Sequence, residues 1–253
     1  MKKINLILNW HSIAGDSLEQ LKDLSGLYSI TQTAFEKQID YLLQNNIPII
    51  PCHLHGNSET LPDFSVSLTF DDGNRSDYDF VYPFLKSKKI SATFFIPVNT
   101  SKLSSQELKE MNKDGFEIGS HAFSHKALRR SNCEDEMSIS KKILEAELHT
   151  TIFSFAFPYG SYTKYTISKA VHTGYHRIFS TERVWNDLTK ENRLLHRWSV
   201  TSDTTLGDFE KIIQKASRGE RLQKGIKLSR VMKRILGNQL SNKLNLFLHK
   251  KHF

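Results

Sequence analysis

The chain has 253 residues, of which 38% are hydrophobic and 25% are charged. This composition is typical of a globular protein and excludes an intrinsically disordered chain. No apolar run reaches the roughly 18 residues that a membrane-spanning helix needs. The length allows one single-core domain, with or without an appendage.

The net charge of +8 is concentrated at the C-terminal end of the chain. Residues 207–253 hold 12 Lys and Arg and 3 Asp and Glu, a net charge of +9, so residues 1–206 hold 23 and 24, a net charge of −1. This break predicts a globular domain over residues 1–205 and a basic tail over residues 206–253.

The first apolar run, residues 4–10, is short and is interrupted by Asn5 and Asn9. His11 and Asp16 follow it in place of a small-residue cleavage site. We therefore interpret this run as a strand and not as a signal peptide, which predicts a cytoplasmic location. In that compartment Cys52 and Cys133 are expected to be free thiols.

Apolar runs alternate with amphipathic stretches, which predicts β-strand and α-helix units around a parallel sheet. Polar residues that end parallel strands gather at one face of a barrel. Strands are expected at Ile4–Trp10, Ile47–Ile50, Val66–Phe70, Ala92–Pro97, Phe116–Ile118, Phe153–Phe157, Arg177–Ser180 and Trp198–Val200. Helical spacing of apolar residues is found over Phe35–Leu43, Ser104–Met111, Ile139–Leu148 and Tyr165–Ala170.

The first chemical signal is the pair Asp71-Asp72, followed by Gly73 at the end of an alternating strand. Adjacent carboxylates repel each other, so a cation is expected nearby. The alternative is an ordinary surface turn, because Asp-Gly is a common turn pair.

The second signal is His121 and His125, directly after the strand Phe116–Ile118. If this segment is helical, both rings share one face, a spacing that suits two imidazoles on one metal. In a chain with 11 histidines, this spacing can also arise by chance.

The third signal is Pro158-Tyr159-Gly160, a rigid turn that follows an apolar strand. Such a turn can direct a backbone N–H into a site, although it can equally be a plain exit from a strand.

Taken in this order, the three signals resemble the motifs of the polysaccharide deacetylase family, the NodB-homology domain of carbohydrate esterase family 4. Phe-Ala-Phe-Pro-Tyr-Gly over residues 155–160 resembles the circularly permuted branch that acts on poly-N-acetylglucosamine. The resemblance implies an α/β fold, a distorted (β/α)7-type barrel, here with a basic helical C-terminal tail. It also implies a metal-dependent hydrolase of carbon–nitrogen bonds, with a role in carbohydrate metabolism and cell-surface polysaccharide biosynthesis.

The resemblance also implies the roles of the site residues. Asp72, His121 and His125 would bind a divalent metal, zinc first, with cobalt or nickel as alternatives. Asp71 would be the general base, and the backbone N–H of Tyr159 would stabilise the oxyanion. Pro158, Gly160 and Arg197 are assigned to substrate binding.

The chain departs from the family pattern at several positions. Ala122 stands where the second motif has a hydroxyl residue, and Ala156 stands where the third usually has Arg. The late Asp-x-x-Asp-Trp motif is not evident, so Arg197 is also a candidate for orienting the base. His11, in Leu-Asn-Trp-His, is the preferred general acid over His249, which has the same Leu-x-x-His spacing in the tail.

The expected partner is an acetylated saccharide, either a polysaccharide or a lipid-linked glycan. Residues 207–253 include apolar residues at helical spacing among basic ones, which predicts peripheral contact with an anionic membrane at its inner surface, or packing on the barrel. No nucleic-acid motif is visible. The alternatives are a non-catalytic saccharide-binding protein and a metal hydrolase acting on another amide or an O-acetyl ester.

Overall fold

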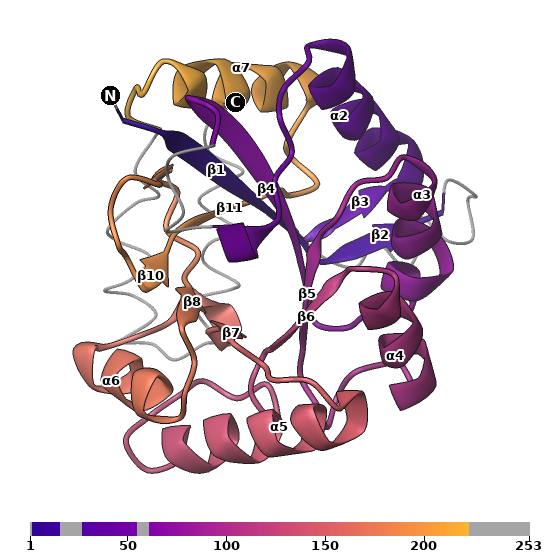
Figure 1. Cartoon of the computed structure of the whole chain (residues 1–253). Coiled ribbons are helices and arrows are strands. Elements are labelled where there is room, and N and C mark those ends of the chain that lie inside the picture. The colour runs from indigo at the N-terminus through magenta and orange to yellow at the C-terminus, as the bar shows by residue number, and fades with distance from the viewer. Residues whose placement is uncertain (1, 16–26, 55–60, 223–253) are drawn as a thin grey trace.

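The computed structural model describes residues 2–15, 27–54 and 61–222, and it shows a ring of strands with helices around much of its outside (Figure 1). The strand order is β10-β8-β7-β6-β5-β4-β1-β11, with every neighbouring pair parallel. One residue, His196, separates β10 from β11, so the two ends of the sheet lie close in sequence and the barrel is nearly closed. The strands are β1 (Ile4–Trp10), β4 (Phe64–Asp71), β5 (Thr93–Ile96), β6 (Glu117–Ser120), β7 (Ser154–Ala156), β8 (Arg177–Phe179), β9 (Asn186–Asp187), which pairs antiparallel with β1, β10 (Leu194–Leu195) and β11 (Arg197–Ser199).

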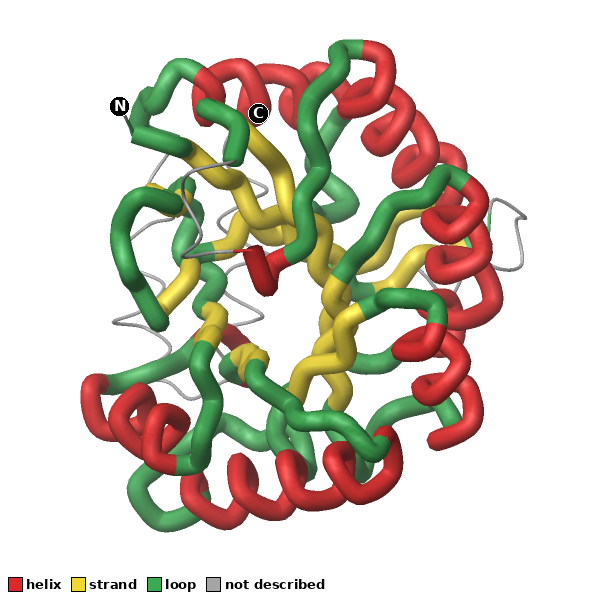
Figure 2. Tube along the Cα trace, viewed as in Figure 1, coloured by secondary structure: helices red, strands yellow, loops and turns green. Residues whose placement is uncertain are grey.

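Helices cover the outside of this sheet, and the tube view shows strands within an incomplete ring of helices (Figure 2). Local sequence sets where they begin. Ser104 and Glu107 form a reciprocal capping box at α4, and Thr31 and Thr205 cap α2 and α7. The predicted distorted α/β barrel is confirmed. The helices are α2 (Gln32–Gln44), α3 (Tyr82–Ser87), α4 (Ser105–Lys113), α5 (Cys133–Leu148), α6 (Lys164–His172) and α7 (Leu206–Ser217), and a small separate sheet pairs β2 (Ser12–Ala14) with β3 (Ser29–Thr31).

Alternation along the strands divides the core into two parts. Outward-facing apolar residues pack under the helices, and a smaller group fills the barrel. The interior therefore has a lower polar layer, a middle apolar layer and an upper polar layer along the strand direction. The lower layer contains Asn5, Thr93, Glu117, Ser154 and Arg177; the middle layer contains Ile7, Phe95, Ala156 and Phe179; the upper layer contains Asn9, Thr69, Asp71, His121 and the guanidinium of Arg197.

One predicted strand differs from the structure, and only the first part of the predicted tail lies within the described residues. Ile47–Ile50 forms only a single bridge, Ile49 to Val66, because Pro48 and Pro51 cannot donate backbone hydrogen bonds. The first part of the predicted tail is α7, whose buried Phe209 and Ile213 join the outer core of the barrel. The rest of the tail, residues 223–253, lies outside the described residues.

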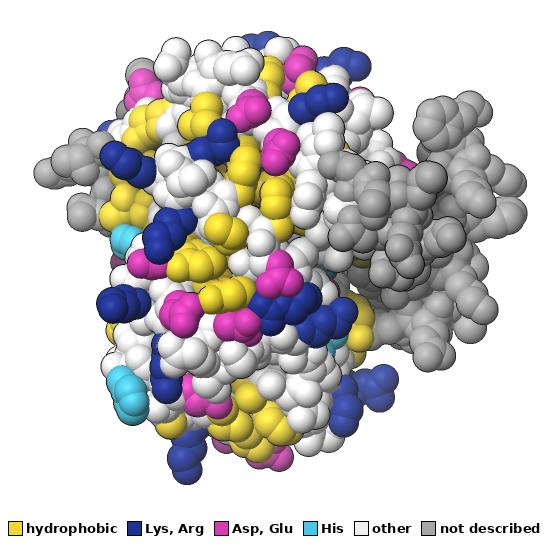
Figure 3. All heavy atoms as spheres, turned by 90° about the vertical axis from the view of Figure 1, so that its right-hand side faces the viewer, with side chains coloured by type: hydrophobic (Ala, Val, Ile, Leu, Met, Phe, Trp, Pro, Cys, Tyr) yellow, Lys and Arg dark blue, Asp and Glu magenta, His cyan; other side chains and the backbone are white. Residues whose placement is uncertain are grey.

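The surface of the described barrel carries charges of both signs. On the face over α3 and α4, basic, acidic and hydrophobic side chains are interspersed (Figure 3). Lys86 pairs there with Asp114, and Arg75 pairs with Glu107. Within the described part of the chain, no helix is long and apolar enough to cross a membrane.

Candidate active site

The two adjacent carboxylates are separated by a sharp turn at the end of β4. Asp71 is the last residue of the strand and is buried in the barrel. Asp72 and Gly73 then adopt positive φ angles of 79° and 57°, so the next carboxylate turns to another direction. A side chain at position 73 would meet Ser101 Oγ at 2.5 Å, which explains the glycine. The Asp-Gly sequence therefore does form a turn, and this turn is what points the two carboxylates in different directions.

The segment from His121 to His125 is a loop and not the helix that would place its rings on one face. Ala122 and His125 have φ angles of 68° and 55°, so the chain reverses direction in left-handed steps. The His121 N–H donates to Ile96 O at 2.9 Å, which ties the start of the loop to β5. The two imidazoles converge, although the helical explanation of their spacing is wrong.

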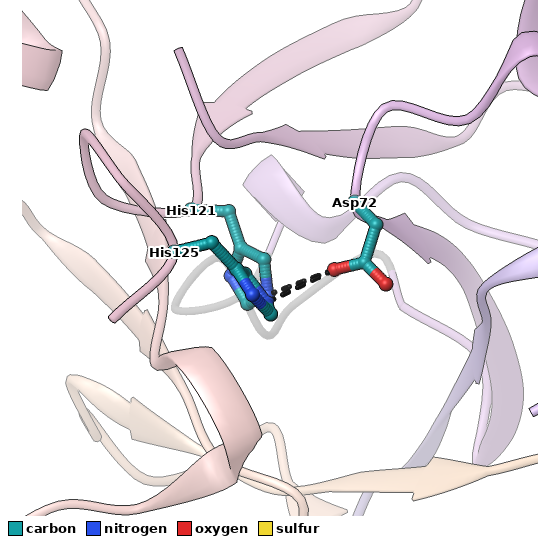
Figure 4. A group of neighbouring side chains, drawn as sticks. All are labelled: Asp72, His121 and His125. Carbon is teal, nitrogen blue, oxygen red and sulfur yellow. Dashed lines mark ion pairs between the residues drawn. The ribbon is translucent and has the colours of Figure 1, made fainter. Parts of the chain in front are cut away.

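Asp72, His121 and His125 form the one group within the described residues whose ligand atoms could hold a metal ion. Both histidines direct Nε2 at Asp72 Oδ1, with distances of 3.1 Å from His125 and 3.6 Å from His121 (Figure 4). Ligands bound to one ion at about 2.1 Å lie about 3.0–3.4 Å apart, so the spacing fits.

The surroundings of these three residues also fit a metal. Asp72 Oδ1 is buried and accepts no hydrogen bond from any described residue, an unfavourable state that a bound cation would relieve. The other ring nitrogen of His121, Nδ1, lies 2.8 Å from Ala156 O, which fixes the ring with Nε2 toward the site. Two imidazoles and one carboxylate suit a divalent transition metal.

The charge states match that role. Burial lowers the pKa of His121 to about 4, so its ring is neutral at pH 7 and can act as a ligand. Burial works to raise the pKa of Asp72, but the neighbouring imidazoles, His125 first, outweigh it, so the carboxylate is ionised.

Asp71 is held rigidly by groups that are not part of the ligand set. Arg197 donates from both terminal nitrogens, at 2.7 Å to Oδ1 and 2.8 Å to Oδ2, and Asn9 donates to Oδ2 at 3.0 Å. Burial works to raise the pKa of Asp71, yet Arg197 and the site histidines hold it below its ordinary value. The carboxylate is therefore ionised and oriented.

Arg197 is fully buried, with its guanidinium 5.0 Å from the centre of the Phe95 ring and 5.8 Å from that of Phe179. It cannot reach a substrate, so its assignment to substrate binding is wrong. Its two hydrogen bonds to Asp71 are the contacts that the other prediction, an orienting role, requires, and that role stays a prediction. Asn9 was not predicted; the signal was a polar side chain inside the apolar strand Ile4–Trp10.

His11 follows β1, and because β1 pairs with β4 in register, it lies beside the acidic turn. Its Nε2 is 3.9 Å from Asp71 Oδ2, and its ring packs on Tyr28 with centroids 4.7 Å apart. The alternative, His249, lies outside the described residues.

The turn after β7 completes the site. Tyr159 and Gly160 have φ angles of 59° and 62°, and the Tyr159 ring packs on His125 with centroids 4.9 Å apart. A side chain at position 160 would meet Thr181 Oγ1 at 1.8 Å, so glycine is required there. Pro158 is buried, so the predicted contact with substrate is not open to it.

Fold and site together define an α/β barrel in which three side chains of metal-ligand type lie beside a buried carboxylate held by an arginine. Residues 58–178 match the sequence model of the polysaccharide deacetylase family. The chain resembles this family over that segment, just under half of its length.

Two curated relatives extend this result. The Bacillus subtilis protein YxkH, named provisionally as a polysaccharide deacetylase, is 32% identical over 124 residues, 46% of this chain and 44% of its own length. A poly-beta-1,6-N-acetyl-D-glucosamine N-deacetylase of Staphylococcus aureus is 29% identical over 157 residues, 53% of this chain and 54% of its own. The chain thus spans about half the length of these relatives.

Solved structures show the same fold. The deacetylase PplD of Streptococcus pyogenes has a TM-score of 0.74 at 21% identity, covering 84% of this chain and 99% of that one. IcaB from Ammonifex degensii has a TM-score of 0.71 at 23% identity, covering 85% and 97%.

Proposed function

We propose that this protein is a metal-dependent deacetylase that hydrolyses the acetamido group of an N-acetylated saccharide to acetate and a free amine. One observation carries the proposal: three metal-type ligands converge beside Asp71, a buried carboxylate that is held by Arg197 and is not itself a ligand. The family and the poly-N-acetylglucosamine deacetylase among the relatives support an acetylated saccharide as the substrate.

Asp72, His121 and His125 would hold the metal, for which zinc is our first choice. When bound, a divalent ion supplies a Lewis acid that polarises a carbonyl and lowers the pKa of water. Asp71, ionised and fixed by Arg197, accepts the proton of the attacking water.

The remaining groups act on the other atoms of the amide. The backbone N–H of Tyr159 donates to the oxygen that becomes negatively charged. His11, beside Asp71, delivers a proton to the leaving nitrogen, so that the amine departs neutral.

The test combines metal analysis with acetate release from an N-acetylglucosamine oligomer, in wild type and in His121→Ala/His125→Ala. We expect one metal per chain and acetate release in wild type, and neither in the variant. His172→Ala is the matched control, because His172 is exposed on α6. It should behave as wild type.

Other outcomes separate the alternatives. Metal binding with release of acetate only from O-acetyl esters would replace the amide by an ester substrate. Wild type that binds no zinc after reconstitution and releases no acetate would favour the non-catalytic, saccharide-binding alternative. The cytoplasmic location and the membrane contact of residues 207–253 stay predictions.

A further inference from the structure

The loop that carries both histidine ligands is conformationally unfavourable on its own. Ala122 and His125 adopt left-handed φ angles, which residues with a β-carbon rarely occupy without support. Ala122 has no hydroxyl with which to hydrogen-bond the loop. The conformation must therefore be held by groups outside the loop.

One side of the loop is held by the segment after β5. The N–H of Val98 donates to Ala122 O at 3.3 Å, and the N–H of Asn99 donates to Phe123 O at 2.8 Å. These contacts fix the middle of the loop by backbone atoms alone, whatever the side chains at 98 and 99. These two hydrogen bonds do not reach Ser124, the residue next to His125, so that residue needs another support.

That support comes from Glu136 on α5. The N–H of Ser124 donates to Glu136 Oε2 at 2.8 Å, and the Ser124 hydroxyl donates to Oε1. Both carboxylate oxygens are thus used on the residue that immediately precedes a metal ligand.

Glu136 is unusual for an acidic residue in this surface helix. It is only 8% exposed, and it forms no ion pair with any described Lys or Arg. A buried carboxylate without a cation is costly unless hydrogen bonds compensate. Its place in the first turn of α5 adds the favourable end of the helix dipole. The hydrogen bonds that compensate for the burial of Glu136 both come from Ser124 in the histidine loop.

We propose that Glu136 is a positioning residue that, through Ser124, holds the His121–His125 loop in the conformation that brings both imidazoles to Asp72. The inference rests on the proposed metal site and adds a residue outside it. Glu136 acts on the geometry of the ligands and touches neither metal nor substrate.

The test measures affinity for Zn²⁺ by titration of the metal-free full-length protein. Glu136→Ala should lower the affinity by about 10–100-fold, the range for supporting groups of metal ligands. Glu136→Gln keeps an acceptor for the Ser124 N–H, so it should recover much of the affinity. Glu134→Ala is the matched control, because Glu134 lies in the same first turn, is exposed and pairs with Lys169. It should bind zinc as wild type does.

A second readout separates positioning from general destabilisation. The visible spectrum of the Co²⁺-substituted protein reports ligand geometry, so it should change in Glu136→Ala and stay unchanged in Glu134→Ala. Ser124→Ala removes one of the two hydrogen bonds and should lower zinc affinity less than Glu136→Ala. In the double variant the losses should not add, because both changes break one interaction.

Wild-type affinity and cobalt spectrum in folded Glu136→Ala would overturn the inference. If that variant does not fold, a wild-type result for Ser124→Ala would do the same. Failure of the proposed function looks different: wild type would bind zinc but release no acetate, while the effect of Glu136 on affinity would persist. Wild type that binds neither zinc nor cobalt would overturn both.

Discussion

The barrel contains two pairs of a carboxylate and an arginine, one at each end of its interior. Asp71 pairs with Arg197 in the upper layer, and Glu117 pairs with Arg177 in the lower layer at 2.8 Å. The middle apolar layer separates them. The chemistry of the two pairs is the same, so the pair alone does not identify an active site.

The difference lies in what surrounds each carboxylate. Glu117 accepts hydrogen bonds from Arg177, Ser154 and Thr93, which all start neighbouring strands, so the pair ties those strands together. It has no described cluster of metal-type ligands next to it.

Asp71, in contrast, has two histidine nitrogens at 3.9 Å, from His11 and His121. Beside it lies Asp72 Oδ1, which is buried and accepts no hydrogen bond from a described residue. Side chains of metal-ligand type next to a satisfied pair distinguish the functional end of the barrel from the structural end.

The largest expected effect tests this distinction through activity. Asp71→Asn should lower kcat by about 10²–10⁴-fold, because a general base typically contributes that much. Bound zinc should be retained, since Asp71 is not in the ligand set. Glu117→Gln, the equivalent change in the lower layer, should leave kcat near wild type. Equal losses in both variants would show that the comparison is wrong.

A second test measures stability. Arg197→Met leaves the fully buried Asp71 without its cation, and breaking a buried pair in this way costs about 3–5 kcal/mol. Both partners of the lower pair are 18% exposed, so water can partly replace Arg177. Arg177→Met should therefore cost less, about 1–2 kcal/mol.

Denaturant unfolding of the two variants and of wild type checks this order. The m-values must agree for the comparison to hold. A larger loss in Arg177→Met would mean that the lower layer carries more of the stability of the barrel.

Much of the site could be predicted because its parts are local in sequence. Asp71 and Asp72 follow an alternating strand, and Pro158-Tyr159-Gly160 follows an apolar one, so each signal is complete within a few residues. The rule that parallel strands end at one face then brings them together. His11 needed one further step, the assignment of Ile4–Trp10 as a strand.

The rest depends on contacts that no local pattern contains. Arg197 reaches Asp71 across 126 positions of the chain, and its role depends on the register of β11 against β1. Glu136 is an ordinary acidic residue of an amphipathic helix until the fold buries it. The left-handed residue of the turn is Ala122 and not a glycine, so the sequence does not indicate a left-handed conformation there. The helical interpretation of His121 and His125 failed for that reason.

The smallest expected effect is a pH dependence that only the upper layer should show. Burial lowers the pKa of His121 to about 4 in the folded protein, against about 6.5 in an unfolded chain. Between these values the unfolded chain binds more protons, so the free energy of unfolding of the metal-free protein should fall as pH decreases from 6.5 to 4. The contribution is fully present above pH 6.5 and amounts to roughly 2–3 kcal/mol.

Two neighbouring groups, His125 and Asp71, also change the free energy of unfolding with pH. His125 acts in the opposite direction, and Asp71 acts at lower pH. Burial works to lower the pKa of His125, but Asp72 outweighs it and raises the pKa, so that residue stabilises the fold at low pH and loses this effect as pH rises through its folded pKa. The pKa of Asp71 is lowered, so its contribution is lost only below about pH 4.

The comparison of His121→Asn with wild type isolates the first contribution from these two. Unfolding of each metal-free protein is measured from pH 7.5 to 4.5, and the variant should lose much of the decrease. Glu117→Gln should keep it, because its position lies in the other polar layer. An undiminished decrease in His121→Asn would mean that the upper layer does not hold its histidine in the neutral form, and the case for a preformed ligand set would then fail.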